Sequence, residues 1–224
     1  MANYRTAPWF QGVLLGGFCL VASVALAYGT KLTAPAIERA AKTDLTASLD
    51  QVIPAAMRTN DMTADTVTLD TADGEITVYR ARTDKTVSAV AYRVIGKGYG
   101  GDLAIVMGVD RSGEILGVRV VQHSETPGLG DKVDVRKTDW VKGFDKRSLA
   151  NTPDAQWAVK KDGGRFDQFS GATITPRAVV KAVKEGLELF EANRARMLGA
   201  EADEPPAASI PAPTVTQKPK RSLS

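Results

Sequence analysis

The feature that most constrains this chain is an uncharged apolar segment close to its beginning. No charged residue occurs from Trp9 to Thr30, and a run of this length can cross the hydrocarbon core of a membrane as a helix. Trp9 and Tyr28 lie near its ends, where aromatic side chains favour the membrane interface. We therefore expect a short N-terminal tail at 1–8 and a single transmembrane anchor at 9–30.

A cleaved signal peptide is the alternative, because Ala25-Leu26-Ala27 has the small-x-small form of a cleavage site. The anchor is favoured, because the apolar run is longer than the roughly 7–15 residues of a signal-peptide core. Membrane orientation stays open, because Arg5 precedes the run and Lys31 follows it, so the positive-inside rule is nearly silent. The one cysteine, Cys19, lies inside the run, so the soluble part has no thiol for a disulfide or an iron–sulfur cluster.

The residues after the anchor combine strand and helix signals. Pro35 to about Val52 has apolar residues at helical spacing and predicts an amphipathic helix. Asp73-Gly74 and Asp110–Gly113 are turn signals between β-rich runs and predict two hairpins. Strands followed by helices indicate an α+β domain at 31–198 with an antiparallel sheet and flanking helices. The predicted strands are 66–69, 76–79, 87–95, 103–109, 115–121 and 157–159, with helical pieces at 138–144 and from Pro176 onward.

Composition changes after the predicted domain. Residues 199–224 are rich in Glu, Asp, Pro, Ala and Thr, and a segment with so little apolar surface is expected to be disordered. The net charge of the whole chain is +3, with acidic and basic residues interspersed. Because no basic stripe with interleaved aromatics is present, we expect no nucleic-acid partner.

The stretch Ser170-Gly171-Ala172-Thr173-Ile174-Thr175-Pro176 leads into the predicted C-terminal helix. Proline suits the first helical position, which would make Thr175 the N-cap. The amides and the dipole of a helix N-terminus favour a phosphate, with Ser170 and Thr173 close by. A plain helix cap that binds nothing is the alternative, and local chemistry alone leaves it open.

Two further stretches are rich in glycine. Gly96–Gly101 contains a formal GxGxxG, but a predicted strand rather than a helix follows it, so a tight connection between strands is favoured over a dinucleotide site. His123–Gly130 predicts a strand end followed by a rigid proline–glycine loop. A hydrolase triad is not expected, because neighbouring side chains on a strand end point in different directions, and one histidine makes a weak metal site. We expect no catalytic residue and no metal ligand.

Taken together, these stretches resemble a known family. Gly98-Tyr99-Gly100-Gly101, His123-x-Glu125-Thr126-Pro127-Gly128-Leu129-Gly130 and Ser170–Thr175 occur in this order behind one membrane segment. The chain resembles the G subunit of the Rnf (or Rsx) electron-transport complex, a covalently flavinylated FMN-binding protein. The resemblance covers roughly residues 31–198 and the anchor.

The resemblance implies FMN joined through its phosphate to the hydroxyl of Thr175 and installed from FAD by a flavin transferase. An unactivated threonine hydroxyl is a poor nucleophile, so we expect the transferase to supply the base and metal. We expect the loop from Glu125 to Gly130 to border the flavin. The expected cofactor-binding residues are Thr175, Ser170, Gly171, Ala172, Thr173, Glu125, Thr126, Gly128 and Leu129.

By resemblance, the function is electron relay in an ion-translocating ferredoxin:NAD oxidoreductase rather than turnover of a small molecule by this chain. The implied partners are the other Rnf subunits, with iron–sulfur clusters and membrane helices. The implied location is the bacterial inner membrane, single-pass, with the soluble domain in the periplasm. Two alternatives remain: the C subunit of the sodium-translocating NADH:quinone reductase, and a non-redox membrane-anchored binding or assembly module.

Overall fold

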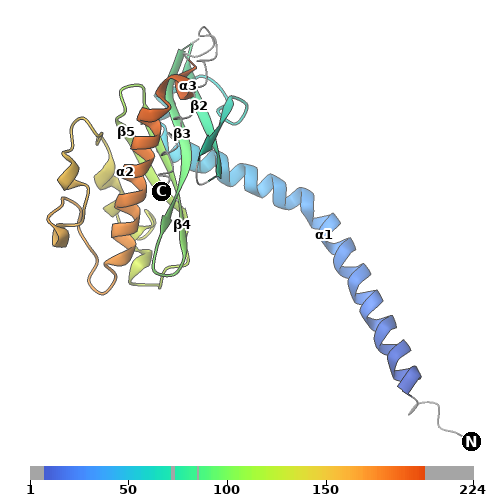
Figure 1. Cartoon of the computed structure of the whole chain (residues 1–224). Coiled ribbons are helices and arrows are strands. Elements are labelled where there is room, and N and C mark those ends of the chain that lie inside the picture. Colours follow the sequence, from blue (N-terminus) through green and yellow to red (C-terminus); the bar gives the residue numbers. More distant parts are fainter. Residues whose placement is uncertain (1–7, 72–73, 85, 200–224) are drawn as a thin grey trace, which may run out of the picture.

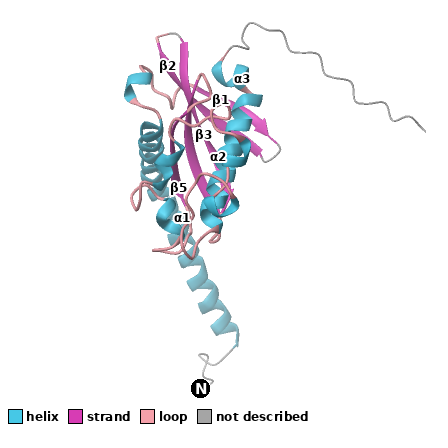
Figure 2. Ribbon diagram, turned by 90° about the vertical axis from the view of Figure 1, so that its left-hand side faces the viewer, coloured by secondary structure: helices cyan, strands magenta, loops and turns pink. Residues whose placement is uncertain are grey.

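A long helix and a compact domain make up the computed structural model, which describes residues 8–71, 74–84 and 86–199. Helix α1 (Pro8–Val52) extends away from the domain in Figures 1 and 2. Its Gly12–Ala34 segment is long and apolar enough to cross a membrane, and none of it is buried in the chain itself. The prediction of one N-terminal apolar helix is confirmed.

The domain is built on a five-stranded antiparallel sheet with the strand order β1-β2-β3-β4-β5. Each strand pairs with the next in sequence, which makes the sheet a meander. Every pair can therefore be joined by a short turn, and no crossover is needed. The strands are β1 (Thr66–Thr71), β2 (Gly74–Thr83), β3 (Thr86–Lys97), β4 (Asp102–Asp110) and β5 (Ile115–Gln122).

Helices cover the two faces of the sheet unequally (Figure 1). Helix α2 (Ile174–Ala192) packs along one face, and the buried Tyr92 hydroxyl on β3 donates a hydrogen bond of 2.7 Å to the Gly186 carbonyl oxygen on α2. The last turns of α1 cover part of the other face through Leu49 and Val52, which are fully buried. The α+β architecture is therefore confirmed. The short helix α3 (Arg194–Leu198) follows α2.

A long connection joins β5 to α2 and is held by aromatic packing. The rings of Trp140 and Phe169 meet edge-on with centroids 5.2 Å apart, and Trp140 Nε1 donates a hydrogen bond of 2.7 Å to the Asp167 carbonyl oxygen. These contacts fix the chain just before Ser170. The 3₁₀ helices of the domain are η2 (Ala55–Met57), η3 (Gly130–Val133), η4 (Trp140–Phe144), η5 (Asp154–Gln156) and η6 (Lys160–Asp162).

Several local predictions differ from the structure. The helix expected from Pro35 to Val52 is continuous with the anchor, because a helix can pass a proline at the cost of one hydrogen bond and a bend. The strand predicted at 157–159 is reduced to one isolated bridge between Val159 and Phe166, and the helix predicted at 138–144 is the 3₁₀ helix η4. Asp73 and almost all of the predicted disordered tail lie outside the described residues.

Packing of α1 on the sheet depends on a small residue in β4. A Cβ on Gly108 would overlap the carbonyl oxygen of Val52, at the end of α1. We expect Gly108→Ala to lower the free energy of unfolding by about 1–3 kcal/mol, as overpacking usually does. Chemical unfolding of the purified chain in detergent measures this. Gly143→Ala is the matched control, because its Cβ would meet no atom within 4 Å; equal stabilities of the two variants would contradict the packing.

Candidate functional site

Three tight turns from distant parts of the chain converge at one end of the domain. The first joins β3 to β4, where the Gly98 amide donates a hydrogen bond of 2.9 Å to the Gly101 carbonyl oxygen. A strand follows this turn, so the glycines make the expected connection between strands. Figure 1 shows the β3–β4 turn and the start of α2 at the same end of the domain.

The other two turns share one design. In residues 126–129, the Leu129 amide donates to the Thr126 carbonyl oxygen at 3.1 Å, and Gly128 at the third position has φ 80°. In residues 169–172, the Ala172 amide donates to the Phe169 carbonyl oxygen at 3.1 Å, and Gly171 also has φ 80°. A positive φ at the third position is the type II requirement that glycine meets without strain. Leu129 Cδ2 lies over Gly171, 3.5 Å from where a Cβ would stand, so these turns are in contact.

A buried carboxylate joins the β3–β4 turn to the start of α2. The Glu125 side chain is only 6% exposed. Its Oε1 accepts a hydrogen bond of 3.0 Å from the Gly100 amide, and its Oε2 accepts one of 2.6 Å from the Thr175 hydroxyl. A buried carboxylate is tolerated only when hydrogen-bonded in this way. Glu125 therefore ties the β3–β4 turn and the start of α2 to its own loop.

Glycines around Glu125 provide the space that the carboxylate occupies. A Cβ on Gly98 would overlap Glu125 Oε1, and one on Gly130 would overlap Glu125 Oε2 and stand 2.8 Å from Thr175 Oγ1. A Cβ on Gly100 would overlap the Ser124 carbonyl oxygen. Gly98 and Gly130 thus leave room for the Glu125 side chain, and Gly100 allows the close approach of the Ser124 backbone.

The prediction that Thr175 is the N-cap of the helix is wrong. Helix α2 begins at Ile174, and the N-cap is Thr173. Pro176 is then the third helical residue, which is permitted because the first four N–H groups of a helix have no partner within it. Thr175 is the second helical residue, so its side chain still belongs to the first turn.

The two threonines at the helix start differ in their surroundings. Thr173 is half-buried, and its hydroxyl makes no capping hydrogen bond. Thr175 is fully buried, and its hydroxyl points to the Glu125 carboxylate. A hydroxyl that donates to a carboxylate has an acceptor for its proton at hand, which is how weak oxygen nucleophiles are activated. Thr175 therefore has a proton acceptor beside its hydroxyl, and Thr173 is the more exposed of the two.

The start of α2 suits a phosphate group. First-turn N–H groups and the helix dipole both favour an anion at this end of the helix. Arg177 also lies near the helix start, and its guanidinium bonds Asp162 at 2.6 and 2.7 Å. Arg177 and Asp162 therefore form an ion pair at the surface. The phosphate site expected from the sequence stays a prediction, with the helix beginning two residues earlier than expected.

Two of the turns and the start of α2 each present one large apolar side chain to solvent. Tyr99 of the β3–β4 turn is 75% exposed, Leu129 is 41% exposed, and Ile174 at the start of α2 is 48% exposed. Each of these side chains leaves apolar surface exposed to solvent. Tyr99 and Ile174 were not among the expected contacts, because only their exposure in the fold distinguishes them from core residues.

The remaining predicted site residues lie around the start of α2 with different exposure. Ser170 and Gly171 are exposed at the tip of their turn, and Ala172 is half-buried. Thr126 and Gly128 are exposed in the neighbouring turn. These residues surround the helix start from two sides, whereas Glu125 and Thr175 lie beneath them.

Acidic residues after the turn at 126–129 hold the loop in place. Asp131 Oδ1 accepts a hydrogen bond of 2.8 Å from the Gly128 amide. The side-chain hydrogen bonds of Arg136 hold the pKa of Asp134 below its usual range, against the opposing effect of burial. The ionised Asp134 thus stabilises the fold at neutral pH, and this is lost as the pH falls through the lowered folded-state pKa. His123 Nε2 lies 4.0 Å from Asp134 Oδ2.

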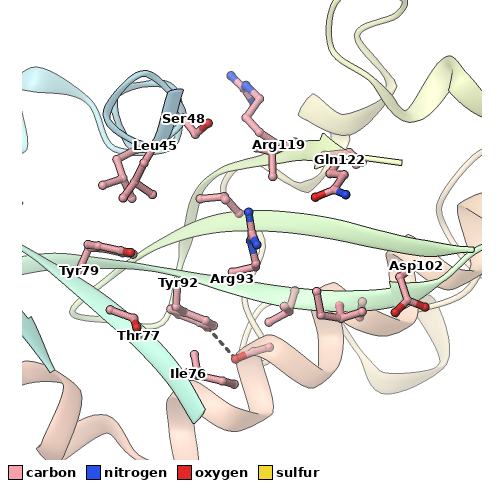
Figure 3. Close-up of a pocket in the computed structure, with 18 of the residues that line it drawn as sticks. Leu45, Ser48, Ile76, Thr77, Tyr79, Tyr92, Arg93, Asp102, Arg119 and Gln122 are labelled. Carbon is pink, nitrogen blue, oxygen red and sulfur yellow. Dashed lines mark hydrogen bonds between the residues drawn. The ribbon is translucent and has the colours of Figure 1, made fainter. Parts of the chain in front are cut away.

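A separate groove lies beside the site rather than within it. Strand β2 pairs with β3 only as far as Tyr92, so the two strands diverge beyond that point. The groove of about 1820 Å³ extends from this gap to the end of α1 (Figure 3). Its lining includes Ile76, Arg93 and Arg119, but no predicted cofactor-binding residue. Among the described residues, no group of three or more His, Cys, Asp or Glu side chains is placed to hold a metal ion.

Comparison with known proteins agrees with this site. The FMN-binding domain family matches residues 98–188, a range that contains all three turns and most of α2, so the chain is a protein with an FMN-binding domain. It is 49% identical over 197 residues to the G subunit of the ion-translocating oxidoreductase complex of Cereibacter sphaeroides (strain ATCC 17029 / ATH 2.4.9), covering 88% of this chain and 90% of the relative. The protein of the same name from Stutzerimonas stutzeri is 48% identical, covering 86% and 84%.

The chain therefore belongs to the family of G subunits of ion-translocating oxidoreductase complexes. This confirms the resemblance to the Rnf G subunit drawn from the three motifs. The crystal structure of NqrC from Shewanella oneidensis has a TM-score of 0.44 and 24% sequence identity, covering 65% of this chain and 73% of that one. At this level the likeness bears on neither fold nor function.

The β3–β4 turn gives a direct test of the site. We expect Gly100→Ala to push the turn away from Ser124 and to weaken the hydrogen bond from its amide to Glu125. The expected loss in the free energy of unfolding is about 1–3 kcal/mol, together with faster hydrogen exchange in residues 125–130. Exchange measured by mass spectrometry tests this, with Gly143→Ala as control. Unchanged exchange in that loop would contradict the junction formed by the hydrogen bonds of Glu125 to Gly100 and Thr175.

Proposed function

We propose that this chain is a membrane-anchored electron relay that carries FMN covalently within an ion-translocating oxidoreductase complex. Its family and its FMN-binding domain support this function. The observation that carries the proposal is the threonine hydroxyl in the first turn of α2, bonded to a buried carboxylate that the β3–β4 turn also bonds. Bound FMN supplies one- and two-electron redox chemistry, which the surrounding hydrogen bonds and charges tune.

The attachment residue in this proposal is Thr175, joined to the FMN phosphate as a phosphoester. Its hydroxyl already donates to a carboxylate, which is the arrangement that an oxygen nucleophile needs. A phosphate on its side chain would lie within the first turn of α2, where the helix dipole favours negative charge. Thr173 is the alternative acceptor, because it is more open, but its hydroxyl makes no capping hydrogen bond and has no carboxylate partner in the part of the chain that the structure describes.

Because Thr175 is buried, the transferase needs access to its hydroxyl before attachment. Gly130 lies directly against the hydroxyl, because a Cβ there would stand 2.8 Å from Thr175 Oγ1. A flavin transferase can therefore reach the hydroxyl only when the loop at 126–130 moves aside. Residues 126–129 of that loop are exposed, whereas Gly130 is buried beside Glu125 and Thr175.

The flavin ring would rest on the protein surface rather than in a deep pocket. Tyr99, Leu129 and Ile174 supply exposed apolar surface around the start of α2. Thr126 and Ser170 are exposed beside them and supply hydroxyl groups. An exposed ring suits electron exchange with a partner protein, because the partner can approach it directly.

The partners and the membrane location proposed for this chain follow from its family and from its apolar helix. The partners are the membrane and iron–sulfur subunits of the complex and the flavin transferase that matures this chain. The apolar part of α1 anchors the chain in the bacterial inner membrane, and the domain lies on the periplasmic side. In both overall views α1 runs from the domain toward the end that bears the β3–β4 turn, which favours a flavin close to the membrane subunits.

Thr175→Ala should abolish covalent flavin, because it removes the acceptor hydroxyl. In a host with an active flavin transferase, the wild-type band should fluoresce on a denaturing gel, and the Thr175→Ala band should be dark. Thr68→Ala is the matched control, because it removes an exposed hydroxyl from β1, outside the three turns, and it should stay fluorescent. Both variants should remain in the membrane fraction.

Two results would overturn parts of this account. A Thr175→Ala band as bright as wild type would place the flavin elsewhere. A dark wild-type band from a host whose transferase is shown to work would refute the covalent-flavin function and favour the non-redox binding module.

Membrane sidedness can be measured independently of the flavin. In a Cys19→Ala background, a cysteine introduced at Ser222 should react with a membrane-impermeant thiol reagent in intact spheroplasts. Labelling is expected because the C-terminal part of the chain follows the apolar helix and should share the periplasmic side. Labelling that occurs only after the cells are lysed would place the domain in the cytoplasm.

A further inference from the structure

The buried Glu125 carboxylate has no evident role in holding a flavin ring on the surface. Both of its oxygens accept hydrogen bonds from the chain itself, one from the Gly100 amide and one from the Thr175 hydroxyl. The second of these contacts is to the oxygen that must become bonded to phosphorus if Thr175 is the acceptor. Glu125 therefore touches the reacting atom before any flavin is present.

We propose that Glu125 is the proton acceptor for flavin attachment to Thr175, so that this chain supplies its own base. This inference rests on the proposed function. The sequence alone left the base to the transferase, because a threonine hydroxyl has no activating partner that a local motif reveals. At 2.6 Å, Glu125 Oε2 is already in position to take the hydroxyl proton. The transferase is then left to supply the metal and to hold FAD.

The reaction balances with these groups. Thr175 Oγ1 attacks the phosphorus atom on the FMN side of the FAD pyrophosphate, and a new oxygen–phosphorus bond forms. The bond from that phosphorus to the bridging oxygen breaks, and AMP leaves. The proton of the Thr175 hydroxyl passes to Glu125 Oε2. No oxidant or reductant is consumed.

The Gly100 amide gives the proton acceptor a fixed orientation. It bonds Glu125 Oε1, which leaves Oε2 directed at Thr175. Once it holds the proton, Glu125 is neutral and can donate a hydrogen bond toward the new phosphodiester. The transfer therefore removes the like-charge contact that an ionised Glu125 would make with the attached phosphate.

Glu125→Gln separates proton transfer from packing, because glutamine keeps the size of the side chain and an oxygen that can accept from Gly100. The apo chain, purified in detergent from a host without the transferase, is mixed with purified transferase, FAD and Mg²⁺. In-gel fluorescence against time gives the initial rate of attachment. Glu125→Gln should lower the kcat of transfer by about 100-fold or more, the usual contribution of a positioned base, while the KM for the apo chain stays within about twofold.

The matched control is Glu185→Gln, which changes an exposed glutamate that pairs with Lys181 on α2 and should react at the wild-type rate. A kcat for Glu125→Gln within twofold of wild type would overturn the proposal. A raised KM with unchanged kcat would also overturn it, because that result indicates a loop that the transferase no longer recognises. A wild-type chain that takes up no flavin at all would instead refute the proposed function.

A second readout is independent of flavin. The Gly100 amide should exchange slowly with solvent in the wild type and in Glu125→Gln, which keeps an acceptor for it, and rapidly in Glu125→Ala. Slow exchange in Glu125→Gln, together with slow attachment, assigns the defect to proton transfer in an intact junction. Rapid exchange in Glu125→Gln would assign the slow attachment to a displaced turn and would contradict the base role.

Discussion

The hydrogen-bonded carboxylate of Glu125 is the interaction on which the functional end of this domain depends. A buried carboxylate is unfavourable unless its oxygens are satisfied, and here the Gly100 amide and the Thr175 hydroxyl satisfy one oxygen each. These bonds connect Glu125 to residues 25 positions before it and 50 positions after it. The neighbouring glycines follow from the same constraint, because a side chain at Gly98 or Gly130 would occupy the space that the carboxylate fills.

Local sequence signals predicted the sheet but not the junction. Alternating β-branched residues and turn signals predicted the strands of the meander, because each strand pairs with its sequence neighbour. The charge-free run predicted the apolar helix, because the length and composition of a segment are enough to identify a membrane-spanning helix. The Glu125 contacts join distant segments, and no local pattern indicates which hydroxyl a carboxylate will meet. The start of α2 was misplaced by two residues because Pro176 fits any first-turn position.

The hydrogen bond between Glu125 and Thr175 would have to change in the proposed flavin attachment. Thr175 is fully buried against Gly130, and its hydrogen bond to Glu125 exists only while the hydroxyl keeps its proton. Two negative charges 4 Å apart repel by about 4 kcal/mol at an effective dielectric of about 20. A phosphodiester on Thr175 and an ionised Glu125 are therefore poor neighbours, whereas a proton kept on Glu125 removes the conflict. Tyr99, Leu129 and Ile174 are exposed, whereas Glu125 and Thr175 are buried, so the groups proposed to meet the flavin ring are separate from those proposed to react with its phosphate.

Tandem mass spectrometry of one tryptic peptide tests this account most directly. Cleavage after Arg165 and Arg177 yields the peptide 166–177, which contains both Thr173 and Thr175. Fragmentation of this peptide from the flavin-bearing wild-type chain should place the mass of the FMN group on Thr175. Placing that mass on Thr173 would contradict the account, because the acceptor would then be a hydroxyl that the Glu125 carboxylate does not contact.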